Sequence, residues 1–142
     1  MNLIVILVTP AQPPRNKEHI ETCPVFITSR ILGKKWTILV LQTLMTPEAN
    51  NGLRFSEIQN ELSWISPKVL TQRLRELEDE GLLLREVDSS DMPVKVTYSL
   101  TDKGQALDSV LIEMQLWGRE YGGKEAERCI EEGFEFCHSC QS

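Results

Sequence analysis

The sequence predicts a mainly α-helical fold that carries one small β-hairpin, and three observations support this class. Apolar residues recur at helical spacing along several stretches between residues 24 and 121. The pattern then changes to two β-rich runs, residues 82–88 and 94–101, with the turn-rich segment SSDMP between them. A composition that is 41% hydrophobic and 25% charged suits a globular core. The 142 residues are enough for one such domain with terminal extensions.

Residues 1–22 are predicted to form an N-terminal arm. The apolar run LIVILV at residues 3–8 could be a short strand, and the proline-rich piece after it is typical of a linker. We expect this arm to be poorly ordered or to pair with a neighbouring chain. No basic residue precedes the run, and no stretch reaches the roughly 18 apolar residues of a membrane span. The sequence therefore predicts a cytoplasmic protein with reduced cysteines and no membrane partner.

Three helices are expected before Ser66, in addition to a loop at residues 47–52. A helix over residues 24–32 has proline at its first position. The stretch 36–45 is apolar almost all round, which places it centrally in a core or an interface. A short amphipathic helix over residues 55–62 follows the loop.

The next helix is expected to begin after Ser66, which caps it, with Pro67 in the first turn. It ends at Gly81. A final helix is predicted from Thr101, with an apolar stripe formed by Leu107, Val110, Leu111, Met114, Trp117 and Tyr121. Two helices joined by a tight turn and followed by a hairpin define a winged helix-turn-helix.

The helix after Ser66 is predicted to turn a polar face outward. At about 100° per residue, Leu70, Leu74 and Leu77 share the inward side. The outward side then carries Lys68, Thr71, Gln72 and Arg75. These side chains can bind base edges or phosphates in a DNA groove, and Ser66 with the first backbone amides can bind a phosphate. Lys95 near the hairpin tip could contact the DNA backbone. The alternative is an ordinary solvated helix face and an ordinary turn lysine.

The charge of the chain is unevenly distributed along its length. The net charge of −6 argues at first against nucleic acid. Residues 30–75, however, carry a net charge of +4, whereas residues 76–142 carry −10. One basic face can therefore still bind phosphate.

A set of motifs occurs in order: Cys23-Pro24, ILGKKW (31–36), LRFSEI (53–58), ISPKVLTQRLRELEDEGLLLR (65–85), VTYSLTDKG (96–104) and Trp117-Gly118. Over residues 20–122 the chain closely resembles the HxlR-type helix-turn-helix family, which is related to the MarR-type regulators. The resemblance implies a winged-helix homodimer, joined through its terminal helices, that regulates transcription from a pseudo-palindromic operator in double-stranded DNA. The predicted organisation is an arm (1–22), this domain (23–122) and an acidic, cysteine-containing tail (123–142). The loop 46–53 looks longer than is usual in the family.

Four cysteines leave several possibilities open. Cys23 precedes Pro24 at a helix start, where the helix dipole lowers a thiol pKa. The resemblance implies a redox or electrophile sensor there, and the alternative is a small buried residue. Cys129, Cys137 and Cys140 could bind zinc, form a disulfide or remain unused thiols, because a single CxxC is a weak signal. No cofactor is otherwise expected.

Two functions other than DNA binding could use a chain of this kind. An enzyme is not expected, because the sequence has no phosphate-binding glycine loop, hydrolase elbow or HExxH motif. A winged helix that serves as a protein-interaction module is the main alternative, given the acidic second half of the chain. Salt-dependent binding to DNA distinguishes the two.

Overall fold

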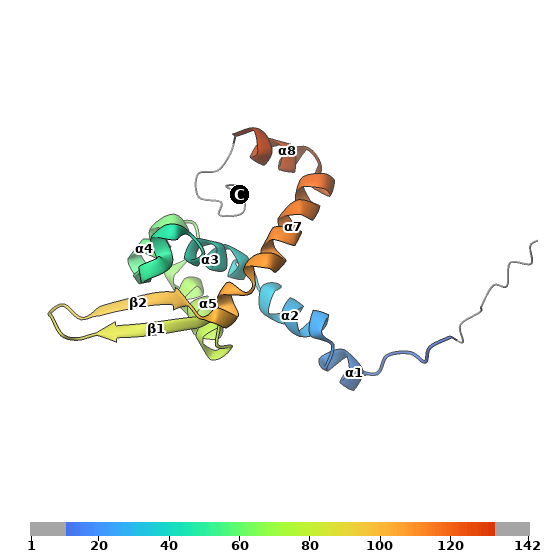
Figure 1. Ribbon diagram of the computed structural model, residues 1–142, viewed down its shortest axis with the longest axis horizontal. Coiled ribbons are helices and arrows are strands. Elements are labelled where there is room, and N and C mark those ends of the chain that lie inside the picture. Colours follow the sequence, from blue (N-terminus) through green and yellow to red (C-terminus); the bar gives the residue numbers. More distant parts are fainter. Residues whose placement is uncertain (1–10, 133–142) are drawn as a thin grey trace, which may run out of the picture. The chain divides into compact units, whose positions relative to one another are not determined.

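The structure is a computed structural model that describes residues 11–132, with side chains described to residue 127 (Figure 1). The possible strand at residues 3–8 lies outside the described residues. The chain divides into two compact units, Met1–Gly33 and Lys34–Ser142, which are considered separately.

The first unit contains two short helices. α1 (Lys17–Glu21) begins at Asn16, whose Oδ1 accepts a hydrogen bond from the His19 amide at 2.8 Å. The sequence predicted only a linker at this place, because the preceding prolines outweighed the asparagine cap and the short helical run. α2 (Pro24–Leu32) follows with proline in its first turn, as predicted.

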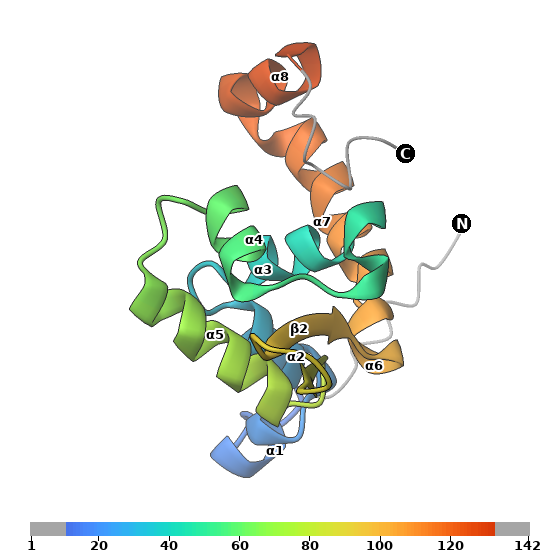
Figure 2. The same cartoon turned by 90° about the vertical axis from the view of Figure 1, so that its left-hand side faces the viewer.

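The second unit contains the predicted helix-turn-helix and hairpin. Its helices before the hairpin are α3 (Thr37–Leu44), the short 3-10 helix η1 (Pro47–Asn51), α4 (Phe55–Glu61) and α5 (Pro67–Asp79). The strands β1 (Leu83–Asp88) and β2 (Lys95–Leu100) form the hairpin, and α6 (Asp102–Gln105), α7 (Asp108–Tyr121) and α8 (Gly123–Glu132) follow it. Figure 2 looks from the tip of the hairpin and shows α5 beside it. The mainly helical winged fold is thus confirmed.

The core of this unit lies where α3, α4 and α5 meet. Val40 and Leu41 of α3, Ile58 of α4 and Leu70 of α5 are completely buried. The prediction left α3 open between a core and an interface position, and its buried face assigns it to the core. The residues on its other side, Ile38, Leu39, Gln42 and Thr43, are half-buried.

The hairpin is antiparallel, with Leu83 opposite Leu100 and Asp88 opposite Lys95. A third extended segment, missed in the sequence, joins it: Leu53 and Tyr98 exchange two backbone hydrogen bonds of 2.9 and 2.8 Å. Gly52 makes this approach possible, because it has a φ of 82° and a Cβ there would lie 3.0 Å from Thr97 Cβ. The loop before α4 is therefore anchored to the hairpin.

The base of the hairpin is tied to the end of α5 by the segment Thr101–Gly104. Thr101 Oγ1 donates a 2.6 Å hydrogen bond to the Gly81 carbonyl and accepts one from the Gly104 amide at 3.1 Å. Lys103 Nζ donates to the Glu80 carbonyl at 2.6 Å. Gly104 packs so closely that a Cβ would lie 2.2 Å from the Leu82 carbonyl oxygen. These contacts fix where the hairpin leaves α5.

The final helix is broken, contrary to the expectation of one continuous helix from Thr101. α6 and α7 are separated at residues 106–107, where Leu107 becomes the N-terminal cap of α7. Of the predicted apolar stripe, Leu111 is buried and Leu107 half-buried. The other members of the stripe are exposed: Val110, Met114, Trp117 and Tyr121. None of the helices in residues 11–132 is long and apolar enough to cross a membrane.

Candidate nucleic-acid interface

α5 presents one face to the core and the opposite face to solvent, as its sequence predicted. Leu70, Leu74 and Leu77 are all at most 2% exposed. Ser66 begins the helix, and its Oγ accepts a hydrogen bond from the Val69 amide at 3.3 Å. The leucine stripe therefore sets the rotation of the helix, and the Ser66 cap sets its starting point.

The four outward side chains of α5 lie together. Lys68, Gln72 and Arg75 are exposed, and Thr71 is half-buried with its hydroxyl donating to the Pro67 carbonyl at 2.8 Å. They line an open hollow of about 510 Å³, which Phe55, Pro67 and Glu76 complete. Within residues 11–127, neither Lys68 nor Arg75 forms an ion pair. The hollow therefore combines two cations that have no protein carboxylate partner with an amide and a hydroxyl.

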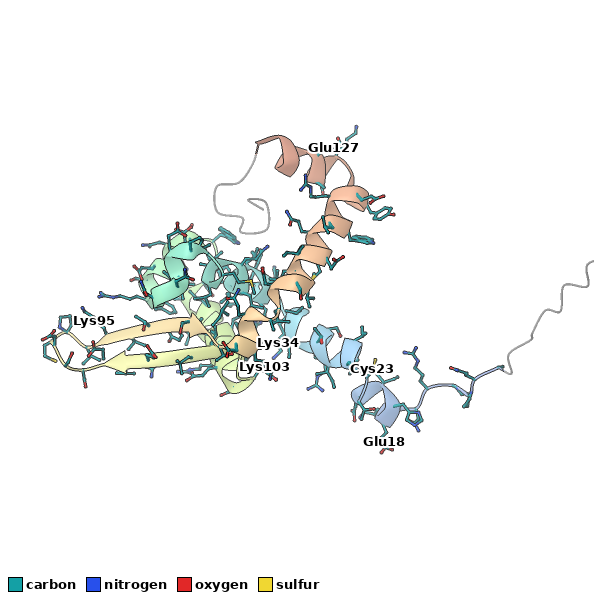
Figure 3. The ribbon with its side chains drawn as sticks, viewed as in Figure 1. Glu18, Cys23, Lys34, Lys95, Lys103 and Glu127 are labelled. Atoms are coloured by element: carbon teal, nitrogen blue, oxygen red, sulfur yellow. The ribbon has the colours of Figure 1, made fainter. Side chains whose placement is uncertain are left out.

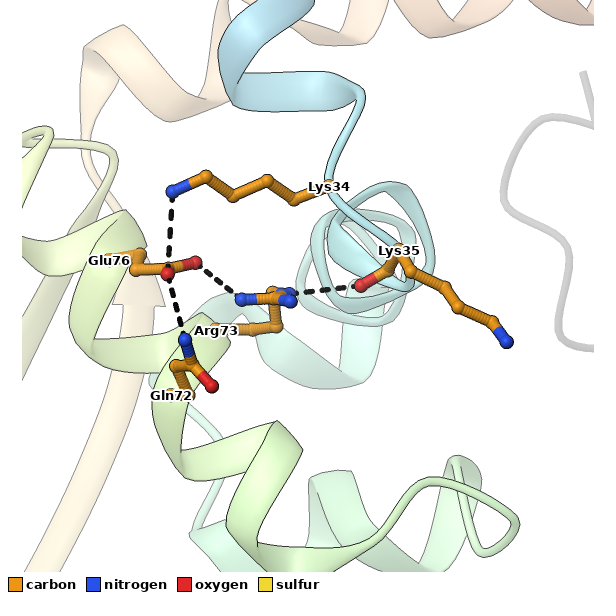
Figure 4. A network of polar contacts seen from close by, with 5 residues as sticks. All are labelled: Lys34, Lys35, Gln72, Arg73 and Glu76. Carbon is orange, nitrogen blue, oxygen red and sulfur yellow. Dashed lines mark hydrogen bonds and ion pairs between the residues drawn. The ribbon is translucent and has the colours of Figure 1, made fainter.

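Glu76 lies at the edge of this hollow and is the centre of a polar network (Figure 4). Its Oε2 is 2.7 Å from Arg73 Nη1, and its Oε1 is 3.3 Å from both Lys34 Nζ and Gln72 Nε2. Arg73 Nε also donates to the Lys35 carbonyl at 2.9 Å. Arg73 thus pairs with an acid inside the domain and does not belong to the outward face of α5.

The network controls the charge of Glu76. Partial burial acts to raise the pKa of this carboxyl, but the hydrogen bonds and charges of Arg73 and Lys34 outweigh burial and lower the pKa below its usual value. Glu76 is therefore a carboxylate at neutral pH, and it can only accept hydrogen bonds.

An aromatic cluster supports the backbone that Arg73 reaches. Trp36 has a left-handed backbone with a φ of 76° at the start of α3. Its ring packs edge-on against Trp64, with centroids 6.5 Å apart, and Lys35 Nζ lies 4.5 Å from its centroid. The residues 34–36 are thereby held in a defined turn beside α5.

Lys95 lies at the start of β2, near the tip of the hairpin (Figure 3). It is exposed and faces Asp88 across the two strands. Hydrogen bonds from the Ser90 hydroxyl and amide, more than the charge of Lys95, lower the pKa of Asp88. The tip therefore offers one accessible cation beside a carboxylate that is engaged with its own turn.

Cys23 is the N-cap of α2 and is a free, half-buried thiol in the first unit (Figure 3). The neutral thiol makes no capping hydrogen bond. The backbone amides of Phe26 and Val25 nevertheless favour the thiolate and lower the pKa of Cys23, against a smaller effect of burial, and the Arg15 charge adds to the lowering. The position is therefore chemically suited to an activated thiol.

The candidate metal ligands in the tail are not brought together by any described contact. Cys137 and Cys140 lie outside the described residues, and so does the side chain of Cys129, which belongs to α8. The part of the chain that the structure describes contains no group of metal-ligating side chains.

The sequence reasoning missed three contributors to the hollow and its rim: Phe55, Glu76 and Lys34. Phe55 is half-buried at the start of α4 and borders the hollow. Glu76 lies four residues after Gln72, a spacing that joins side chains on one helix face and could have revealed it. Lys34 is 42 residues away in sequence, and no local signal connects it to Glu76.

The fold and the exposed basic face of α5 define a winged helix-turn-helix. A model of the HxlR-like helix-turn-helix family matches residues 31–126, which is more than half of the chain. The chain belongs to this family.

The chain is also similar to proteins named as HTH-type transcriptional regulators. It is 43% identical over 102 residues to YvaP, an uncharacterized HTH-type transcriptional regulator of Bacillus subtilis (strain 168), covering 71% of this chain and 90% of YvaP. It is 40% identical to the HTH-type transcriptional regulator YodB of the same organism, covering 72% and 87% of the two chains.

Solved structures agree with this fold. The reduced form of YodB from B. subtilis matches with a TM-score of 0.62 at 39% identity, covering 71% of this chain and 95% of that one. The redox regulator HypR in its oxidized form matches with a TM-score of 0.57 at 36% identity, covering 69% and 96%.

Proposed function

We propose that this protein is a sequence-specific transcriptional regulator that inserts α5 into the major groove of double-stranded DNA. The observation that carries the proposal is the outward face of α5, where Lys68, Gln72 and Arg75 are exposed above a fully buried leucine stripe. Arg and Lys recognise guanine edges or phosphates, and Gln recognises adenine. The acids of α5 lie toward its other end, so the N-terminal half faces DNA.

The proposed contacts with the DNA backbone come from the start of α5 and from the tip of the hairpin. The Lys68 amide, which is the first N–H of α5 because Pro67 has none, and the helix dipole favour a phosphate at the start of α5, whereas the Val69 amide already bonds to Ser66 Oγ. Lys95 reaches a neighbouring stretch of backbone or the minor groove from the hairpin. Phosphate contacts of this kind set the register, and the side chains of the α5 face supply the sequence preference.

The proposal is tested by binding to DNA selected from a random pool. We expect enrichment of a pseudo-palindromic sequence, with an affinity that falls steeply as salt rises. Lys95→Ala should weaken binding to all sequences alike and reduce the salt slope by about one phosphate contact. If no sequence is enriched and no fragment binds at low salt, the protein-interaction module becomes the better account.

The regulator is proposed to act as a homodimer joined through α7. Met114, Trp117 and Tyr121 share one face of α7 and are 47–66% exposed, which is unusual for large apolar side chains. A symmetric dimer would bury this face and place two α5 helices about 34 Å apart, one turn of DNA. Sedimentation should give a dimer at micromolar concentration, and Trp117→Glu should give a monomer. A monomeric wild type would contradict the dimer.

A thiol response through Cys23 is proposed as a control on binding. The support is its position at the start of α2 and its lowered pKa. A structure of diamide-treated YodB is also similar to this chain, at 40% identity and a TM-score of 0.58. Diamide should change operator affinity in wild type and leave Cys23→Ser unaffected. Equal behaviour of the two proteins would contradict this role.

Zinc at Cys129, Cys137 and Cys140 remains a separate proposal, supported only by the sequence. About one zinc per chain in anaerobically purified protein, lost in Cys137→Ser, would support it. Metal-free protein of unchanged DNA affinity would contradict it.

A further inference from the structure

We propose that Gln72 reads an adenine in the operator and that Glu76 is its positioning residue, which fixes the orientation of the Gln72 amide. The inference rests on the proposed DNA-binding function and adds to it a specificity-determining pair. It starts from the network of Figure 4, in which Lys34 and Arg73 hold the Glu76 carboxylate beside Gln72.

The orientation follows from the chemistry of the two partners. A primary amide carries donors on nitrogen and acceptors on oxygen, whereas a carboxylate only accepts. Glu76 Oε1 lies 3.3 Å from Gln72, so only Nε2 can face it. The reversed amide would place Oε1 against a negative oxygen. Arg73 and Lys34 keep that oxygen charged and in place, since they bond to Oε2 and Oε1 respectively.

Once Glu76 fixes its orientation, the Gln72 amide has one N–H and its oxygen left to bind DNA. One N–H of Gln72 is engaged by Glu76, and within residues 11–127 no other protein group bonds to this side chain. The second N–H and Oε1 are the groups of this exposed side chain that remain for a ligand. Adenine offers the complementary pair in the major groove, an N7 acceptor and an N6 donor. Guanine instead places its O6 acceptor where Oε1 lies, so the same amide disfavours guanine.

Glu76→Gln tests this arrangement. The substituted amide is similar in size and both donates and accepts, so Gln72 can turn over and present its N–H groups to guanine O6. We expect one adenine position of each half-site to be preferred over guanine by about tenfold or more in wild type, the discrimination typical of a bidentate pair. In Glu76→Gln that preference should fall below about threefold, while preferences at other positions remain.

Matched variants separate orientation from charge. Glu78→Gln removes the same charge from an exposed site on α5 and should keep the adenine preference. Gln72→Ala should lose the preference at the same position. In the Gln72→Ala background, adding Glu76→Gln should change it no further, because the residue being oriented is absent.

The readout is the dissociation constant for the selected operator and for its adenine-to-guanine variants, measured with the full chain. An unchanged preference in Glu76→Gln, or an equal loss in Glu78→Gln, would overturn the positioning role. If Glu76→Gln does not fold, Gln72→Ala still decides, since an intact preference there overturns the inference. Failure of the proposed function would look different, because wild type would then select no sequence.

Discussion

The outward face of α5 and the base of the hairpin differ in whether their polar groups bond to other groups of the protein. At the base, the Thr101 hydroxyl, the Lys103 ammonium and the Gly81 carbonyl all bond within the protein. On the α5 face, Lys68 and Arg75 have no protein partner within residues 11–127. The difference separates a joint that positions the elements from a surface that is open to a ligand.

The two regions also differ in how clearly a sequence motif marks them. The segment TDKG belongs to the pattern by which the chain resembles its family, yet its described contacts are structural. A short motif can therefore mark the scaffold, while the side chains proposed to read DNA are ordinary polar types at exposed positions.

The largest expected effect is on the joint. Gly104→Ala should lower the free energy of unfolding by about 3 kcal/mol, because the new Cβ meets the Leu82 carbonyl oxygen at 2.2 Å. Urea unfolding measures the loss. Gly118→Ala in α7 is the matched control when both changes are made in the Trp117→Glu background that removes the proposed dimer. Apart from the neighbouring helix backbone, no atom of residues 11–127 lies within 4 Å of its Cβ, so it should stabilise by about 0.5–1 kcal/mol. Equal stabilities of the two variants would contradict the close approach.

Arg75→Ala should weaken DNA binding and leave the stability of the fold unchanged. We expect its stability to be unchanged, because the side chain is exposed, and its affinity for the selected operator to fall by about 1–3 kcal/mol. Fluorescence anisotropy with specific and random duplexes measures this. An equal loss on both duplexes would reassign Arg75 to a phosphate contact.

A smaller effect on the joint is expected from Thr101. Thr101→Val removes the hydroxyl that bonds to Gly81 and caps α6, and should cost about 1 kcal/mol of stability. Thr101→Ser keeps the hydroxyl and should stay closer to wild type. Thermal unfolding of both variants makes the comparison, and a valine variant as stable as the serine variant would show that these bonds contribute nothing.

The smallest effect concerns Glu76, which lies at the edge of the hollow. The pKa of Glu76 is lowered in the folded protein, so its pairing stabilises the fold above the unfolded carboxyl pKa, and this contribution is lost as pH falls through the folded value. Stability should therefore fall more between neutral pH and about pH 3 in wild type than in Glu76→Gln. Parallel pH profiles would contradict the pairing.

The sequence predicted the parts of the fold that depend on local pattern. The leucine stripe of α5, the Ser66 cap and the hairpin follow from spacing and turn residues, and all are found. The exposure of Lys68, Gln72 and Arg75 followed from the same helical geometry.

Features that depend on pairing between distant residues were not predicted. The bridge between Leu53 and Tyr98 and the contact of Lys34 with Glu76 join residues more than 40 positions apart. The break between α6 and α7 at residues 106–107 also has no counterpart in the apolar spacing, which continues through it. α1 was missed because five residues give too short a periodicity to register beside prolines.

The central claim is that the outward face of α5 is the surface that contacts DNA. Backbone amide chemical shifts of the full chain, followed as the selected duplex is added, test it most directly. The account predicts the largest changes over residues 66–76, with a second set around Lys95. Changes confined to α7 and α8, with residues 66–76 unperturbed at saturating duplex, would contradict it.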